Sequence, residues 1–195
     1  MAHGTILLAL GANLPSRVGP PTATLRQALA ELGRSVGEIG TISRFFVTEA
    51  VPAGSGPDFV NAAASLSLRQ EWTAEDLLSR LHGIEAALGR RRGRRWGART
   101  LDIDLLGWGA RVLPDRAAQA AWMALGQARA ARTAPPAVPV LPHPRLHERA
   151  FVLVPLAEVA PGWVHPATGL DVTAMLARLP EAERAAVKPF DAGMA

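Results

Sequence analysis

The sequence contains no cysteine. Disulfide bonds, thiolate nucleophiles and cysteine-based zinc sites are therefore excluded, and the composition suits a reducing compartment. Long hydrophobic runs are also missing. The apolar stretch from Ile6 to Leu10 is too short for a signal peptide or a membrane span, and no basic segment precedes it. These absences predict a cytoplasmic protein that has no membrane partner.

Lysine is nearly absent, because Lys188 is the only one. It does not follow a glycine-rich loop, which excludes a Walker A motif, and no lysine lies on an early strand as a protein kinase requires. No G-x-G-x-x-G pattern follows the first apolar stretch, which argues against a Rossmann nucleotide site. If the chain binds ATP, it does so on another scaffold.

Positive charge is concentrated in one short segment. Residues 90–99 hold six arginines and no acid, whereas the whole chain has a net charge of +4, so the rest of the chain is slightly acidic. A nucleic-acid-binding protein usually spreads its basic residues along a face that follows several phosphates. One cluster fits a single polyphosphate better.

Two acids follow this segment on a predicted strand over 101–106. Strand side chains alternate between faces, so Asp102 and Asp104 point the same way while Leu101, Ile103 and Leu105 face the core. Adjacent carboxylates repel unless a cation lies between them, which indicates a site for a hard metal such as Mg²⁺, with arginines for phosphate oxygens. Taken alone, an Asp-x-Asp pattern is more often a solvated polar face; its place beside the arginines favours the metal site.

The chain of 195 residues, 49% of them hydrophobic, can bury one core, and we predict a single α+β domain over 1–195. Hydrophobic periodicity predicts a strand, a helix, two strands, a helix and a strand. They cover 5–10, 20–33, 39–47, 59–68, 73–89 and 101–106. This is the split-βαβ or ferredoxin-like order, an antiparallel sheet with helices on one face. A C-terminal extension follows, with a closing helix over 171–179.

Other candidates lie on the strand over 59–68 and on the following helix. Phe59 and Asn61 face away from the apolar side of the strand, toward Asp102 and Asp104, and such a pair can hold a flat heterocycle. The residues alone equally allow an edge aromatic beside a turn. For Glu85, both an ion pair with an arginine of the following loop and a direct ligand contact stay open. For His82, partial burial is the simpler interpretation.

The segment from about 114 to 137 is alanine-rich and then proline-rich. We predict an inserted surface helix over 116–132, weakly anchored by Trp122 and Leu125, then a stiff linker, with no part in the chemistry. Next come His143 and His147, which have the spacing of helical zinc ligands. The prolines on either side of His143 make a helix there unfavourable, so we reject a zinc pair.

Five segments together resemble the 6-hydroxymethyl-7,8-dihydropterin pyrophosphokinases of folate biosynthesis, which transfer diphosphate from ATP to a pterin. The segments are LALGAN near the start, PDFVNA at 57–62, IEAALGRRR at 84–92, RWGARTLDIDLL at 95–106 and LPHPRLHERAFVLVPLAEVAP at 141–161. The last two in combination are highly specific. The resemblance implies a ferredoxin-like fold and, because no further enzyme domain accompanies it, the stand-alone form.

The resemblance also implies residue roles. Asp102 and Asp104 are expected to hold two Mg²⁺ ions that bridge the ATP phosphates, and Arg90 and Arg92 to lie on a catalytic loop. The residues implied for ATP are Glu85, His82, Trp96, Arg99, Ile103, His143 and Arg149. Those implied for the pterin are Thr48, Val51, Phe59, Asn61, Trp96 and Phe151. The chain departs from the family where Thr48-Glu49-Ala50-Val51-Pro52 replaces the usual Thr-x-Pro-x-Gly loop.

The main alternative is a single-stranded RNA-binding module, because RNA-recognition motifs also use a ferredoxin-like sheet with exposed aromatics. Acids on the same sheet face disfavour it, since they repel phosphate unless a metal intervenes. The expected partners are therefore ATP and 6-hydroxymethyl-7,8-dihydropterin, with no nucleic acid and no obligate protein partner.

Overall fold

The computed structural model describes residues 4–51, 54–90, 99–125, 136 and 138–191. Within these ranges, no helix combines the length and the apolar character needed to cross a membrane. The described residues form the predicted α+β fold, in which helices pack on an antiparallel sheet.

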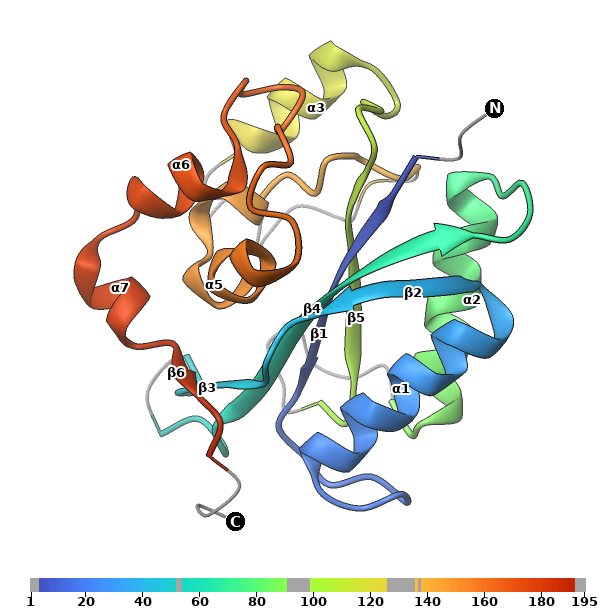
Figure 1. Ribbon diagram of the computed structural model, residues 1–195, viewed down its shortest axis with the longest axis vertical. Helices are drawn as coiled ribbons and strands as arrows, with labels where there is room; N and C mark the ends of the chain where they lie inside the picture. The colour runs from blue at the N-terminus through green and yellow to red at the C-terminus, as the bar shows by residue number, and fades with distance from the viewer. Residues whose placement is uncertain (1–3, 52–53, 91–98, 126–135, 137, 192–195) are drawn as a thin grey trace.

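The sheet runs through the middle of the molecule (Figure 1). Its strands have the order β5-β1-β4-β3-β6, and β2 also pairs with β4. The strands are β1 (Ile6–Ala12), β2 (Gly37–Ile42), β3 (Phe46–Thr48), β4 (Phe59–Leu68), β5 (Asp102–Trp108) and β6 (Lys188–Pro189). β1 lies between β4 and β5 and is antiparallel to both, as the split-βαβ order requires.

The helices begin and end at recognisable signals. They are α1 (Pro21–Ser35), α2 (Ala74–Ala87), α3 (Arg116–Met123), α5 (Ala150–Val159), α6 (Val172–Ala177) and α7 (Glu181–Ala185), with a 3-10 turn η1 (Leu146–Glu148). The hydroxyl of Thr73 caps α2 by accepting the backbone N–H of Asp76 at 3.0 Å. Asp115 and Asp171 cap α3 and α6 in the same way.

One face of the sheet carries the main core. Ile6, Leu8 and Leu10 of β1 are at most 2% exposed, and they pack with residues of β4 and β5 against α1 and α2. The apolar face predicted for β4 and the core direction predicted for Ile103 and Leu105 are confirmed. Packing in this core fixes the positions of the strands, and therefore also the positions of the side chains on their other face.

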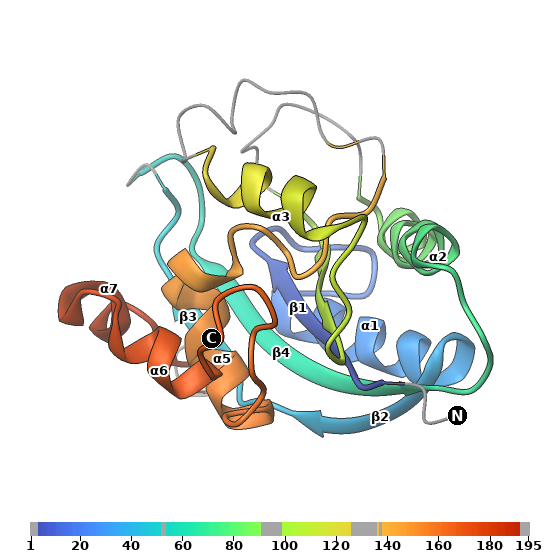
Figure 2. The same cartoon turned by 90° about the horizontal axis from the view of Figure 1, so that it is seen from above.

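The opposite face differs from the prediction that helices cover one face only. α5 packs on part of it against Leu7, Ala63 and Leu106, and α6 completes the cluster. Figures 1 and 2 show α5, α6 and α7 on the other side of the sheet from α1 and α2. The sequence did not predict α5, because a uniformly apolar run that contains Pro155 has no helical period.

Several predicted elements have different bounds, and three of them differ in instructive ways. The strand predicted over 39–47 is split into β2 and β3, because the hydroxyl of Ser43 takes the place of a backbone carbonyl and accepts the N–H of Ala63 at 2.9 Å. α1 continues past Gly33 to Ser35. α3 ends at Met123, before the predicted residue 132, and residues 126–135 lie outside the described ranges.

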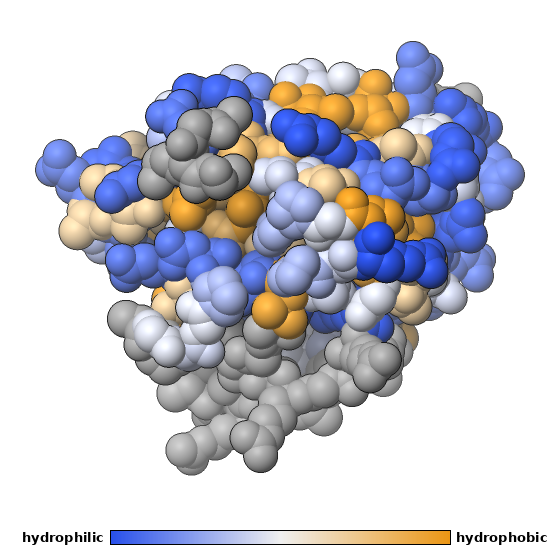
Figure 3. Space-filling view, turned by 90° about the horizontal axis from the view of Figure 1, so that it is seen from below, coloured by the Kyte–Doolittle hydropathy of each residue, from blue (hydrophilic) through white to orange (hydrophobic). Residues whose placement is uncertain are grey.

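Figure 3 shows one outer face of the molecule, on which hydrophobic side chains lie in small groups among hydrophilic ones. Such scattered groups are ordinary for a folded domain, whereas a broad continuous patch would indicate an interface.

Candidate active site

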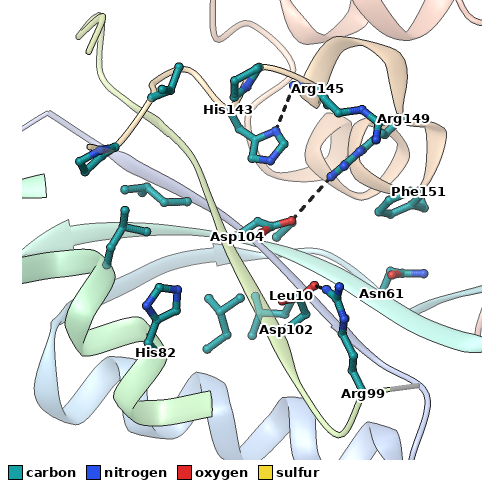
Figure 4. A pocket seen from close by; sticks show the side chains of 18 of the residues that line it. Leu10, Asn61, His82, Arg99, Asp102, Asp104, His143, Arg145, Arg149 and Phe151 are labelled. Atoms are coloured by element: carbon teal, nitrogen blue, oxygen red, sulfur yellow. Dashed lines mark hydrogen bonds and ion pairs between the residues drawn. The ribbon is translucent and has the colours of Figure 1, made fainter. Parts of the chain in front are cut away.

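The part of the second sheet face that α5 leaves open is the floor of a pocket of about 970 Å³. Residues of β1, β4 and β5 line the floor, while α2, α5 and the segment from 138 to 145 supply walls. Figure 4 shows His82 on one side of Asp102 and Asp104, and Asn61 and Phe151 on the other. The pocket therefore has a charged centre between two ends.

Most of the predicted site residues come together here. Those that line the pocket are Thr48, Val51, Phe59, Asn61, His82, Arg90, Arg99, Asp102, Ile103, Asp104, His143, Arg149 and Phe151. Glu85 lies behind the pocket wall, 2% exposed. The predicted residues Arg92 and Trp96 lie outside the described residues.

Strand pairing fixes the floor of the pocket. Gly11 of β1 lies opposite both Asn61 of β4 and Asp102 of β5, so the three residues form one row across the sheet. Ala9 lies opposite Asp104 in the next row on this face. A Cβ atom at Gly11 would lie 3.2 Å from Oδ1 of Asn61. Glycine therefore leaves the space above the middle of the row free.

Asp102 is the most heavily paired acid of the centre. One carboxylate oxygen lies 2.7 Å from Nη1 of Arg90, and the other accepts from Nη1 of Arg99 (Figure 4). Even so, removal from water and the nearby charge of Asp104 raise the pKa of Asp102. The two arginines therefore do not fully offset burial and the charge of Asp104, and this carboxylate pair suits a further cation.

Glu85 supports the charged centre from behind the pocket wall. Its carboxylate accepts the backbone N–H of Ile103 at 2.7 Å and pairs with the guanidinium of Arg90. Of the two possibilities left open for Glu85, the ion pair with an arginine that follows the helix is present. Burial raises the pKa of Glu85 to about 7, although the Ile103 N–H and Arg90 both oppose the rise. Glu85 connects α2 to β5 and holds Arg90 over Asp102.

Arg149 and His143 lie above the floor. Nη1 of Arg149 is 3.8 Å from Asp104, and its guanidinium carbon is 5.7 Å from the ring centre of Phe151. Nδ1 of His143 accepts the N–H of Arg145 at 3.1 Å (Figure 4). Burial, then Arg149 and Arg145, lower the pKa of His143 to about 3. At neutral pH the ring is therefore uncharged and carries its hydrogen on Nε2.

The end near Phe151 combines aromatic rings with a fixed amide. Nδ2 of Asn61 donates to the hydroxyl of Thr48 at 2.9 Å, which orients the amide. Phe59 is half-buried, whereas Phe151 is 40% exposed and Val51 is 76% exposed. Exposed apolar groups beside an oriented amide can receive a flat heterocycle with a polar edge.

Two residues of the site were not predicted. Arg145 lines the pocket and also pairs with Glu148; its place two residues after His143 was the available signal. Asn13 is 3% exposed, accepts the N–H of Arg99 at 2.7 Å and donates to the carbonyl of Pro57 at 3.0 Å. Asn13 ends the LALGAN segment, but the sequence predicted no role for it, because its partners are distant in the chain.

The pocket lining also includes a residue of the 114–137 segment. Trp122 of α3 belongs to it, as do residues of α2 and of the chain from 138 to 141. The sequence predicted that this helix has no part in the chemistry, and its Trp122 nevertheless reaches the pocket. Among the described residues, no group of three or more histidines or acids could hold a metal ion alone, so a metal at Asp102 and Asp104 would need ligands from a bound molecule or water.

Known proteins match this chain over most of its length. Residues 7–161 match the family model described as 7,8-dihydro-6-hydroxymethylpterin-pyrophosphokinase (HPPK). A 2-amino-4-hydroxy-6-hydroxymethyldihydropteridine pyrophosphokinase from Synechocystis is 35% identical over 175 residues, which cover 89% of this chain and 75% of that protein. The protein of the same name from Methylorubrum extorquens is 38% identical over 154 residues, covering 77% of this chain and 82% of that protein.

Solved structures agree on the fold. A Plasmodium falciparum HPPK-DHPS triple mutant has a TM-score of 0.64 at 12% identity and covers 90% of this chain. This chain spans only 43% of that longer protein, so the likeness concerns the shared fold alone. With the sequence match to the family model and to two relatives above 30% identity, the chain belongs to the 7,8-dihydro-6-hydroxymethylpterin-pyrophosphokinase family, the pyrophosphokinases of folate biosynthesis.

Proposed function

We propose that this pocket binds ATP and 6-hydroxymethyl-7,8-dihydropterin and transfers diphosphate from the first to the second. The observation that carries the proposal is one sheet face on which an aromatic-and-amide end meets a centre of paired acids and arginines. The pterin hydroxymethyl oxygen attacks the β-phosphorus, the bond from that phosphorus to the oxygen shared with the α-phosphorus breaks, and AMP leaves. The hydroxyl proton passes to solvent.

The pterin occupies the end lined by Phe59, Asn61 and Phe151. The two rings pack against the heterocycle, and the amide of Asn61, oriented by Thr48, bonds its polar edge. Val51 lies at the rim of this end. Trp96, outside the described residues, is proposed to contribute to the same end.

The triphosphate occupies the charged centre. Arg90, Arg99 and Arg149 offer guanidinium donors to phosphate oxygens. The neutral ring of His143 donates from Nε2, because Nδ1 already accepts the Arg145 N–H. His82 lines the wall on the nucleotide side, and Ile103, whose side chain faces the core, contributes its backbone to the floor. Arg92, outside the described residues, is proposed to act beside Arg90. Catalysis then consists mainly of positioning and charge neutralisation.

Glu85 has a positioning role in this scheme. It is too deeply buried to contact ATP directly, but it holds Arg90 and the backbone of Ile103. Asn13 acts similarly on Arg99 from the end of β1. Preorganised donors need little rearrangement when charge develops on the transferred phosphates.

Asp102 and Asp104 are proposed to hold Mg²⁺, two ions being expected with ATP. The fit rests on their shared sheet face, on the pKa of Asp102, which Asp104 helps to raise, and on oxygen ligands, which Mg²⁺ prefers. When bound, the metal neutralises phosphate charge and makes the β-phosphorus more open to attack. Arg90 and Arg99, which now pair with Asp102, can then donate to phosphates instead.

A pterin-dependent assay of AMP release from ATP and Mg²⁺ tests the proposal. We expect the intact chain to release AMP only with the pterin, EDTA to stop the reaction, and Asp104→Asn to lower kcat at least about 100-fold. Asp191→Asn, a change at an exposed acid outside the pocket, is the matched control and retains activity. No AMP from a folded wild-type chain would contradict the proposal; salt-sensitive, Mg²⁺-independent RNA binding would favour the alternative.

A further inference from the structure

Part of the pocket lining belongs neither to the charged centre nor to the residues proposed for the pterin. It includes the apolar side chains of Leu78 of α2, Trp122 of α3 and Val140, with Glu75 and Ser79 as polar members. Figure 4 places His82, four residues after Leu78 on α2, across the acid pair from Phe151. An apolar cleft with a few polar groups, next to a charged centre, suits an aromatic group attached to a phosphate chain.

Trp122 faces inward because of how α3 is built. Gln119 is fully buried, and Trp122 follows it by three residues, so both lie on the same side of the helix. Ala120 and Ala121 are exposed, which marks the opposite side. Trp122 is partly buried, so part of its indole stays open to the pocket.

α3 is fastened to the same chain segment that forms the pocket wall. Nε2 of Gln119 donates to the carbonyl of Pro142 at 3.4 Å, next to His143. Before the helix, the backbones of Leu113 and Leu141 exchange two hydrogen bonds of 2.9 and 3.0 Å. Arg116 donates to the carbonyl of Pro166 at 3.1 Å. Trp122 therefore has a defined place relative to the residues proposed to bind phosphate.

We infer that Trp122, supplied by the 114–137 segment, contacts the nucleoside part of ATP and sets the preference for a nucleotide over a bare polyphosphate. The inference rests on the proposed function, which puts the triphosphate at the centre and the pterin at the Phe151 end. Of the pocket lining that the structure describes, the part that includes Leu78, Trp122 and Val140 is then left for the base and ribose of ATP. The indole offers a large, rigid, apolar surface for a base.

The test compares two ligands that share a phosphate chain. The first is α,β-methylene ATP, in which the bond that breaks is replaced; the second is inorganic tripolyphosphate, which has no base or ribose. Both are titrated with Mg²⁺ by calorimetry. We expect Trp122→Ala to weaken the nucleotide analogue about tenfold and to leave the tripolyphosphate Kd unchanged, with Trp122→Phe recovering most of the loss.

In the AMP assay, the same Trp122→Ala variant should raise KM for ATP about tenfold while kcat and KM for the pterin stay within about twofold. Met123→Ala, a change at the neighbouring position that does not line the pocket, should alter neither ligand. Circular dichroism confirms that each variant is folded.

Two results would overturn the inference. An unchanged Kd of Trp122→Ala for the nucleotide analogue would show that Trp122 makes no contact, and equal weakening of both ligands would show that it acts through the phosphate site. A wild-type chain that binds the analogue yet makes no pterin diphosphate would overturn the proposed reaction but leave this inference standing. A wild-type chain that binds neither ligand would overturn both.

Discussion

The two faces of the sheet are made by the same strands but hold different residues. Behind the sheet, Leu8 and Leu10 alternate into a continuous apolar core against α1 and α2. On the other face, the alternate residues of the same strands differ along the strand. At one end they are apolar and pack under α5, and at the other end they are Gly11, Asn61 and Asp102, which line the pocket. Each site residue is thus flanked along its strand by core residues. Substitutions on the core face should therefore lower mainly stability, and substitutions on the pocket face should lower mainly activity.

The largest effect on stability should come from the core face. Leu8 is fully buried in the main core, one residue from Ala9, which lines the pocket. Leu8→Ala should lower the free energy of unfolding by about 3 kcal/mol, because it leaves a cavity that the core cannot fill. Urea denaturation measures the change, and kcat per folded molecule should stay near the wild-type value.

Asp104→Asn provides the counterpart, with a large loss of activity and a change in unfolding free energy below about 1 kcal/mol. If Leu8→Ala instead abolished activity in a fully folded protein, the separation of the two faces would be wrong.

Glu85 joins the two faces, and its effect should depend on pH. Its pKa is about 7 in the folded chain against 4.5 as a free side chain, so the folded state holds this proton more tightly than the unfolded state does. The stabilising contribution of the bound proton is complete below pH 4.5 and is lost as pH rises through about 7. Up to about 3 kcal/mol of stability is involved.

Glu85→Gln should remove this dependence, so the free energy of unfolding of the variant should fall less between pH 4.5 and 7 than that of the wild type. Glu75→Gln, at an exposed acid of the same helix, is the control and should keep the wild-type slope. Equal slopes for wild type and Glu85→Gln would contradict the assignment.

The smallest effect should come from the pterin end. Thr48→Val removes the hydroxyl that orients Asn61, and we expect KM for the pterin to rise roughly fivefold with kcat nearly unchanged, the range of one neutral hydrogen bond. Thr48→Ser keeps the hydroxyl and should behave as the wild type. An equal rise in both variants would assign the effect to the lost methyl or to loop packing instead.

Strand periodicity was enough to predict β4 over 59–68 and the shared face of Asp102 and Asp104, because alternation is a local property. The sequence did not predict that a helix, α5, covers part of the second sheet face, because a uniformly apolar helix has the same sequence pattern as a buried strand. The connection from Asn13 to Arg99 joins positions far apart in the chain, and no local pattern reports it. The inward face of α3 depends on Gln119, a polar residue whose burial only the fold reveals.

The row formed by Asn61, Gly11 and Asp102 has a further consequence, because it sets a fixed distance across the pocket floor. The row spans two interstrand spacings, about 9.5 Å, and the hydrogen-bond ladders of β1 hold that length constant. In the proposed function, a pterin held by its polar edge at Asn61 would have to place its hydroxyl within that length to meet phosphates near Asp102. The sheet would then select for the reach of the substrate's side arm, independently of how well its ring fits.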